Sequence, residues 1–263
     1  MKKIFLSLVL ALTISVANAW NKEAETGIVI LATKHLSAQG QSLVNQYLGA
    51  DYYDDVQYLL NLEKKKSAKH TKEIHYLHLG SDMKPLAVEG DDAYKALNEA
   101  ISVVRSHTAY PKAEVVKAMR VIINLMIDIH HLSSVRIEGI PHSQADFKIL
   151  SYGGDIGSRA KRVANIKWST LWSSYTGWHT GFSGALWAED IELCHGKRSA
   201  EFAKGNLNDW VAHIGTVASE HLSRIKPNYE MTRRERNELE YVNYEMMARA
   251  GYRLAALFND IAK

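Results

Sequence analysis

KAEVVKAMRVIINLMIDIHHLSS, residues 112–134, predicts one long helix, because its apolar residues recur at spacings of three and four. Apolar residues cover most of the circumference of this helix. The pattern therefore indicates a helix in the middle of a helical protein rather than at its surface. The residues that carry the periodicity are Val115, Val116, Met119, Ile122, Ile123, Met126 and Ile129.

Three polar residues interrupt this apolar helix. Asn124, Asp128 and His131 follow one another at i, i+4 and i+7, and this spacing predicts a single polar stripe on one face. A buried carboxylate costs several kcal/mol unless it is paired, hydrogen-bonded or metal-bound. Two interpretations stay open at this point. Asp128 either meets a cation or backbone donors in the core, or it lines a metal-binding cleft between helices.

The rest of the chain favours an all-α protein with one domain, residues 20–263. Four prolines and long periodic segments point to helix packing, and no linker or repeat divides the chain. From 137 to 164 the periodicity fails, and glycines predict a long loop. Segment 73–79 reads as extended or loop-like and carries His75 and His78, of which we expect one to face inward. The other expected helices are 23–48, in two parts broken near Ser37 and Gly40, and 51–62, 91–107, 185–193, 209–225 and 234–261.

Residues 1–19 have the features of a secretory signal peptide, with a basic start, an apolar stretch and an Ala-Asn-Ala cleavage site. We therefore expect an exported protein, periplasmic or secreted, whose mature chain starts at Trp20. No later run approaches the ~18 apolar residues of a membrane span. Loss of Lys2 and Lys3 lowers the formal charge from +3 to +1, which excludes a strong overall field for nucleic acid or anionic membrane. The single cysteine, Cys194, cannot form an intrachain disulfide, and we expect it in the core.

The order of motifs along the mature chain resembles that of the S1/P1 nuclease family. These secreted zinc-dependent single-strand nucleases and nucleotidases are related to bacterial zinc phospholipase C. The motifs that carry the resemblance are Trp20 at the mature N-terminus, HLS at His35–Ser37, IHYL at Ile74–Leu77, the helix with Asp128, Gly153-Gly154, Trp172, Asp209-Trp210, and AGYRLAALFNDI at Ala250–Ile261.

The resemblance implies a multi-helix domain of the phospholipase C/P1 nuclease type. It also implies metal-dependent hydrolysis of phosphodiester bonds in single-stranded nucleic acids or nucleotides, with zinc ions activating water. Asp128 takes the place of the bridging, catalytic aspartate, and the amine and carbonyl of Trp20 take the place of the first ligand. The metal ligands implied in this chain are Trp20, Glu25, Glu63, His75, Asn124 and Asp128.

Several family ligands are replaced in this chain. Asn124 and Ser134 stand at two histidine positions of the central helix motif, and Ser169 and Ser173 stand where the family has a histidine and an aspartate. Serine hydroxyls are poor zinc ligands beside imidazole and carboxylate. We therefore expect reduced zinc occupancy, with His131 or His142 as candidate replacement ligands. The remaining set is rich in carboxylates, which also suits calcium, magnesium or manganese.

Two functions stay open. The first is a weakened nuclease or phosphoesterase, with single-stranded nucleic acid, a nucleotide or another phosphoester as its substrate. The second is a catalytically inactive protein that keeps the scaffold for binding or a structural role. The cluster Trp168, Trp172 and Trp178 fits either core packing or base stacking.

Overall fold

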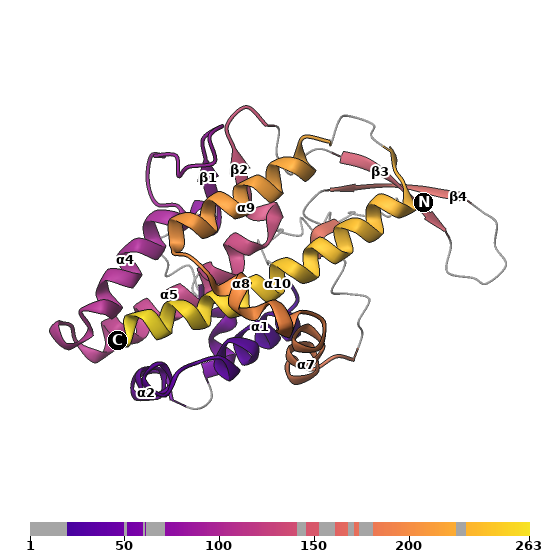
Figure 1. Cartoon of the computed structure of the whole chain (residues 1–263). Helices are drawn as coiled ribbons and strands as arrows, with labels where there is room; N and C mark the ends of the chain where they lie inside the picture. The colour runs from indigo at the N-terminus through magenta and orange to yellow at the C-terminus, as the bar shows by residue number, and fades with distance from the viewer. Residues whose placement is uncertain are drawn as a thin grey trace, which may run out of the picture.

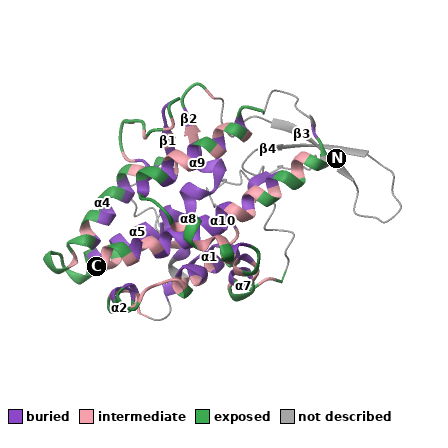
Figure 2. Ribbon diagram, viewed as in Figure 1, coloured by how far each residue is buried: buried purple, intermediate pink, exposed green. Residues whose placement is uncertain are grey.

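The apolar helix predicted at the centre of the chain is the central helix of the protein. In the computed structural model, α5 (Lys112–His130) contacts α4 (Ala93–Arg105), α10 (Arg233–Ile261), α2 (Ala38–Tyr47), α9 (Leu207–Leu222) and α1 (Lys22–Lys34). Its residues from Val121 to His130 are all buried, as Figure 2 shows. The structure describes residues 20–49, 52–59, 61, 72–140, 146–152, 161–167, 171–173, 181–224 and 230–263. The predicted signal peptide lies outside these ranges.

The described chain forms a mostly helical single domain (Figure 1). The remaining helices are short: α7 (Gly184–His195), α8 (Ser199–Ala203) and the 3-10 turns η1 (Tyr52–Gln57), η2 (Lys72–His75), η3 (His107–Ala109), η4 (Leu132–Ser134) and η5 (Gly196–Arg198). The segment 23–48 divides as predicted into two helices, with Ser37 as the N-cap of α2. Segment 51–62 is less regular than predicted and begins with η1.

Helix α5 ends four residues earlier than the periodicity predicted. His131 leaves the helical conformation, with φ −81° and ψ 104°, and residues 132–134 form η4. His131 therefore does not continue the helical stripe of Asn124 and Asp128. The turn brings the chain into β2 (Val135–Ile137), which pairs in parallel with β1 (Leu77–Leu79). This pairing places the segment that carries His75 next to the end of α5.

Helix α10 packs on α5 and α1. It begins with a capping box, in which Thr232 accepts from the backbone N–H of Glu235 and the Glu235 carboxylate accepts in return. Gly251 allows the close approach to α1, because a Cβ there would lie 2.7 Å from Leu31 Cδ2. Helices α5, α1 and α10 all contribute to one hydrophobic core, which α4, α7 and α9 complete among the described residues.

The prediction of a long loop at 137–164 was wrong. Residues 146–152 form β3 (Asp146–Tyr152), which pairs antiparallel with β4 (Lys161–Lys167) and in parallel with β5 (Glu230–Met231). In β3, DFKILSY, apolar and polar residues alternate over only a few positions. Its antiparallel partner β4 follows in the sequence after a segment that contains glycines. Helical periodicity could not reveal such a pairing. The all-α prediction therefore holds only as a mostly helical fold with two small sheets among the described residues.

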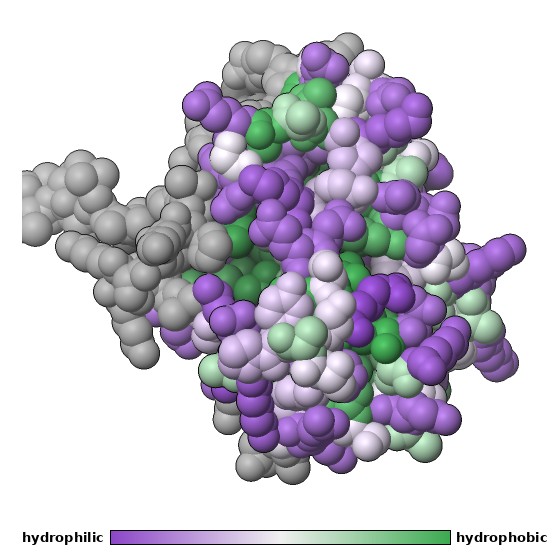
Figure 3. Space-filling view, turned by 90° about the vertical axis from the view of Figure 1, so that its left-hand side faces the viewer, coloured by the Kyte–Doolittle hydropathy of each residue, from purple (hydrophilic) through white to green (hydrophobic). Residues whose placement is uncertain are grey.

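Two surface features complete the description. Cys194 is exposed, which corrects the prediction that it belongs to the core. It follows exposed Leu193 on the outer side of α7. Hydrophilic residues cover most of the described part of the face in Figure 3, with hydrophobic surface in separate areas between them. Within the described ranges, no helix combines the length and apolar character needed to span a membrane.

Candidate metal centre

Trp20 and Glu25 meet at the start of α1. Asn21 caps the helix by accepting from the Ala24 backbone N–H. Glu25, in the first turn of this helix, is buried in the interior. The backbone nitrogen of Trp20 donates to Glu25 Oε1 at 3.1 Å. The indole Nε1 of Trp20 donates to Asn243 Oδ1 of α10 at 2.8 Å. Both Trp20 and Glu25 are buried, so the expected mature N-terminus is fixed in the interior.

His75 and Asp128 form the second pair of the site. His75 ends η2, and its Nδ1 lies 2.7 Å from Asp128 Oδ2 of α5. An ionised carboxylate only accepts, so the His75 ring donates to Asp128 through Nδ1. Carboxylates commonly orient metal-binding imidazoles in this way. His78 instead lies nearer the surface beside Glu73, so one of the two histidines faces inward, as predicted.

The electrostatics of Glu25 connect the two pairs. Burial, and next the negative charge of Asp128, raise the pKa of the Glu25 carboxyl well above its ordinary value. The hydrogen bond from the backbone N–H of Trp20 lowers the pKa of Glu25, but by less. A cation bound between two buried carboxylates offsets their mutual repulsion. Its positive charge favours the ionised form of each carboxyl group and so lowers its pKa. Carboxylate oxygens and an imidazole nitrogen are donor types that suit a divalent cation, but Glu25, Asp128 and His75 stand as two neighbouring pairs rather than around one position.

Asn124 lies one turn before Asp128 on α5, and the amide is held by the backbone. Its Oδ1 accepts from the Leu59 N–H at 3.2 Å, and its Nδ2 donates to the Arg120 carbonyl at 2.9 Å. An amide oxygen is a donor type that can also bind a hard metal ion. Asn124 also ties the segment after η1 to the central helix.

His131 lies beside Trp20 rather than on the helical stripe. Its ring meets the Trp20 ring edge-on, with centroids 5.0 Å apart. Its Nδ1 lies 2.7 Å from Ser133 Oγ, and its Nε2 lies 3.4 Å from Ser173 Oγ. Burial lowers the pKa of His131 well below its ordinary value, so the ring is neutral. Ser173, one of the positions where the resemblance implies a lost ligand, thus contacts a candidate replacement ligand.

The remaining predicted site residues lie beyond the described ranges. These are Glu63, His142 and Ser169. Ser134 is described and buried. Among the residues that the structure describes, no three His, Cys, Asp or Glu side chains are grouped closely enough to hold one ion. The structure thus brings Trp20 to Glu25 and His75 to Asp128 as two neighbouring pairs.

Asn243 is a site residue that the sequence interpretation missed. It is fully buried on α10 and holds the Trp20 indole. The signal was present in the sequence, because Asn243 lies on the same helical face as Leu239 and Met246. A buried polar residue on an apolar face requires a partner.

Comparison with models of known protein families and with curated proteins found no match to this chain.

Proposed function

We propose that this chain is an exported S1/P1-nuclease-like hydrolase with a reduced metal site and weak metal-dependent phosphodiesterase activity. Its fold is then of the phospholipase C/P1 nuclease type, and its mature form begins at Trp20. One observation carries the proposal. The Trp20 nitrogen, Glu25, His75 and Asp128, which come from three distant segments, meet in the interior as two hydrogen-bonded pairs.

The residues have separate tasks in this proposal. Asp128 carries negative charge at the centre of the site and orients the His75 ring through Nδ1. Glu25 adds the second carboxyl group, and burial together with the negative charge of Asp128 raises its pKa; a bound cation would favour its ionised form. A bound divalent cation would supply Lewis-acid polarisation of the phosphoryl group and lower the pKa of a water molecule. Zinc or a harder cation such as manganese or magnesium fits this donor set.

The substrate class follows from the same resemblance. Single-stranded nucleic acid and nucleotides present an accessible phosphodiester or phosphomonoester to a site of this kind. The mature chain has a formal charge of only +1, so long-range attraction to nucleic acid is weak. Recognition would therefore depend on local contacts at the site, with stacking on an aromatic ring contributing ~1–3 kcal/mol per base.

The test is elemental metal analysis of protein that starts at Trp20, together with hydrolysis assays on single-stranded DNA and on 3′-nucleotides. The proposal expects at least one divalent ion per chain and hydrolysis that a chelator abolishes and added metal restores. A well-folded protein that binds no zinc, manganese, magnesium or calcium and shows no hydrolysis would contradict it.

One contact favours a second candidate function, a catalytically inactive protein that keeps the scaffold for binding. Ser173, where the resemblance implies an aspartate, contacts His131 through its hydroxyl. A hydroxyl supplies neither the charge nor the affinity of a carboxylate for zinc. The same metal analysis separates the two functions, because metal binding without any hydrolysis would favour the inactive scaffold.

A further inference from the structure

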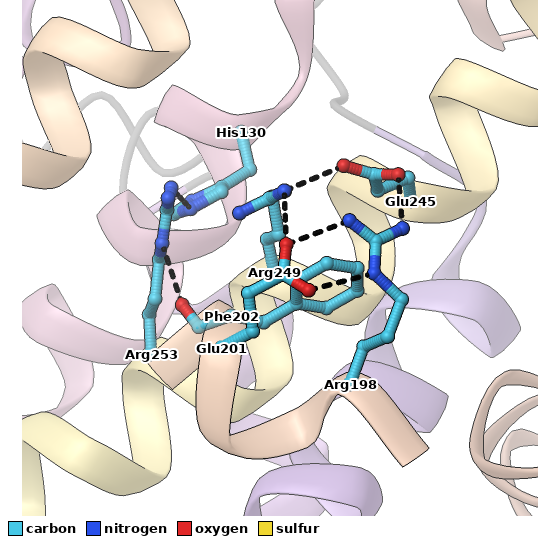
Figure 4. Close-up of polar contacts among 7 residues, drawn as sticks. All are labelled: His130, Arg198, Glu201, Phe202, Glu245, Arg249 and Arg253. Carbon is cyan, nitrogen blue, oxygen red and sulfur yellow. Dashed lines mark hydrogen bonds and ion pairs between the residues drawn. The ribbon is translucent and has the colours of Figure 1, made fainter. Parts of the chain in front are cut away.

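A second polar cluster lies where α8 packs on α10 and the end of α5 (Figure 4). Glu245, Arg249 and Arg253 follow one another at intervals of four on α10, so they share one face of that helix. Arg198 of η5 and Glu201 of α8 approach this face from one side, and His130 of α5 approaches it from the other. We call these residues, together with His213 of α9, the arginine cluster.

Two of the three arginines are neutralised by the two glutamates. Arg249 donates through Nε and Nη2 to Glu245 Oε1, at 2.9 and 2.6 Å. Arg198 donates through Nη1 to Glu245 Oε2 at 3.0 Å, and through Nε and Nη2 to Glu201 at 2.9 and 2.7 Å. Three arginines against two glutamates leave one excess positive charge, which Arg253 carries.

Arg253 is 2% exposed, and no carboxylate contacts it in the described part of the chain. Its Nε donates to the Phe202 carbonyl at 3.2 Å, and its Nη1 lies 3.0 Å from His130 Nε2. His130 Nδ1 lies 2.7 Å from the Met126 carbonyl, which only accepts, so Nδ1 carries the proton and Nε2 accepts from Arg253. Nη2 of Arg253, which bears two N–H groups, has no acceptor among the described residues.

The charge on Arg253 persists at neutral pH. Burial, and next the positive charge of Arg249, lower the pKa of Arg253 to about 9. The face of Trp210, 5.8 Å from the guanidinium carbon, and the Phe202 carbonyl compensate only part of this charge. An uncompensated buried charge is costly, and water can accept hydrogen bonds but cannot cancel the charge.

His213 adds an unsatisfied group on the same side. Its Nδ1 is buried and has no hydrogen-bond partner within the described ranges. Burial, then the charges of Arg249 and Arg253, lower the pKa of His213 to about 4, so His213 lies within the electrostatic field of both arginines. Nη1 of Arg249 also has no acceptor among the described residues. Arg253 and Arg249, one turn apart on α10, thus offer guanidinium donors in a cluster with net positive charge, and the buried His213 ring lies within its field.

We propose that Arg253, Arg249 and His213 bind one small monovalent inorganic anion such as chloride. A single negative charge matches the single excess positive charge of the arginine cluster. Glu201 and Glu245 on its rim oppose a more highly charged anion. The burial of Arg253 restricts the site to a small ion. The inference stands independently of the proposed metal centre.

Thermal unfolding of the full mature protein in chloride, at ionic strength held constant with gluconate, tests the proposal. A ligand that binds only the folded state stabilises it by mass action, so the midpoint should rise saturably, by about 3–6 °C at ten times the dissociation constant. The pKa of His213, followed by its ring NMR resonances, should rise over the same concentrations. Equal midpoints in chloride and gluconate would overturn the proposal, and stronger stabilisation by sulfate would overturn its charge assignment.

Variants place the effect at the arginine cluster. Arg253→Met removes the excess charge, so the chloride-dependent rise should disappear. Arg105→Met removes an exposed arginine that pairs with Asp260 and should keep the full rise. Anomalous diffraction from crystals of the unmodified protein in bromide gives a result even if Arg253→Met does not fold. A bromide peak in contact with Arg253 Nη2 supports the site, and no peak there at saturating bromide refutes it.

Discussion

Asp128 is the residue on which the proposed metal centre depends most directly. Asp128→Asn keeps the shape of the side chain, but it removes the charge and can no longer act as a pure acceptor for His75 Nδ1. We expect metal affinity to fall at least ~10-fold, and hydrolysis to fall with it. Elemental analysis after dialysis against limiting metal measures the first effect.

Asp92→Asn is a matched control for this substitution. Asp92 is also a buried aspartate, but it caps α4 by accepting from the Lys95 N–H. Asparagine caps a helix nearly as well as aspartate, so both stability and metal content should change little. If Asp128→Asn kept its metal and only lost stability, Asp128 would be a structural core carboxylate.

Trp20 provides a second test at the scale of one residue. Its backbone nitrogen donates to Glu25, and its side chain is buried against His131 and Asn243. One extra residue before Trp20 replaces the free amine by an amide, which is a poor metal ligand. We expect metal affinity to fall while the unfolding midpoint changes little, as calorimetry and metal titration would show. The control is one extra residue after Lys263, and equal affinity in both proteins would argue against Trp20 as a ligand.

His213 makes stability depend on pH. Burial, with Arg249 and Arg253 next, lowers its pKa from 6.5 to about 4. Between these values the unfolded chain binds a proton that the folded chain does not, so stability falls as the pH falls from about 6.5 to about 4. The slope per histidine is at most ~1.4 kcal/mol per pH unit. Denaturant unfolding in chloride-free buffer should show a shallower slope for His213→Gln, and an unchanged slope would refute this assignment.

At the scale of elements, the contact between α1 and α7 depends on glycine. A Cβ on Gly27 would lie 2.4 Å from Trp187 Cβ and 3.1 Å from the Gly184 carbonyl, and neither atom can rotate away. Gly27→Ala should therefore lower the free energy of unfolding by ~1–3 kcal/mol. In Gly196→Ala the new methyl group would meet only the Glu192 side chain, which can shift but contacts His35 and Tyr252, so the loss should be smaller than for Gly27→Ala. Denaturant unfolding of both variants compares them.

The elements also show what the sequence could predict. Long helices with strong periodicity, α5 and α10, were predicted with nearly correct bounds, because burial of one face requires that spacing. The end of α5 was placed too late, since Leu132 continues the apolar phase although His131 has left the helix. Strands β3 and β4 were missed because their pairing depends on distant residues and on few alternating positions.

The site could be predicted only in part for a similar reason. Asp128 was identified because a polar residue in apolar surroundings requires a partner, and His75 through the resemblance; the two side chains contact each other. The link between Trp20 and Asn243 joins residues 223 positions apart, a pairing that no local pattern specifies. The arginine cluster could not be predicted either. The local sequence around Arg253 is that of an ordinary helix, and its burial depends on contacts with the distant residues Phe202 and His130.

At the scale of the whole molecule, the resemblance to the S1/P1 nucleases predicts which positions of this chain correspond to the metal ligands of that family. We call this correspondence the register. Four substitutions together, Asn124→His, Ser134→His, Ser169→His and Ser173→Asp, would restore the implied ligand set. Three of these positions, Asn124, Ser134 and Ser173, lie in described segments near Asp128 or His131, and Ser169 lies outside them. If the register is correct, the fourfold variant should bind more zinc than the original protein and hydrolyse single-stranded DNA faster.

The control for this variant is the same four substitutions combined with Asp128→Asn. The restored ligands can build a multi-ion centre only around a bridging carboxylate, so the fivefold variant should lose the gained zinc and activity. Circular dichroism must show the same helix content in all three proteins, because four new side chains in a packed interior can also disturb it. A folded fourfold variant without extra zinc would mean that these positions do not converge on one site, and the proposed relationship to this nuclease family would then fail.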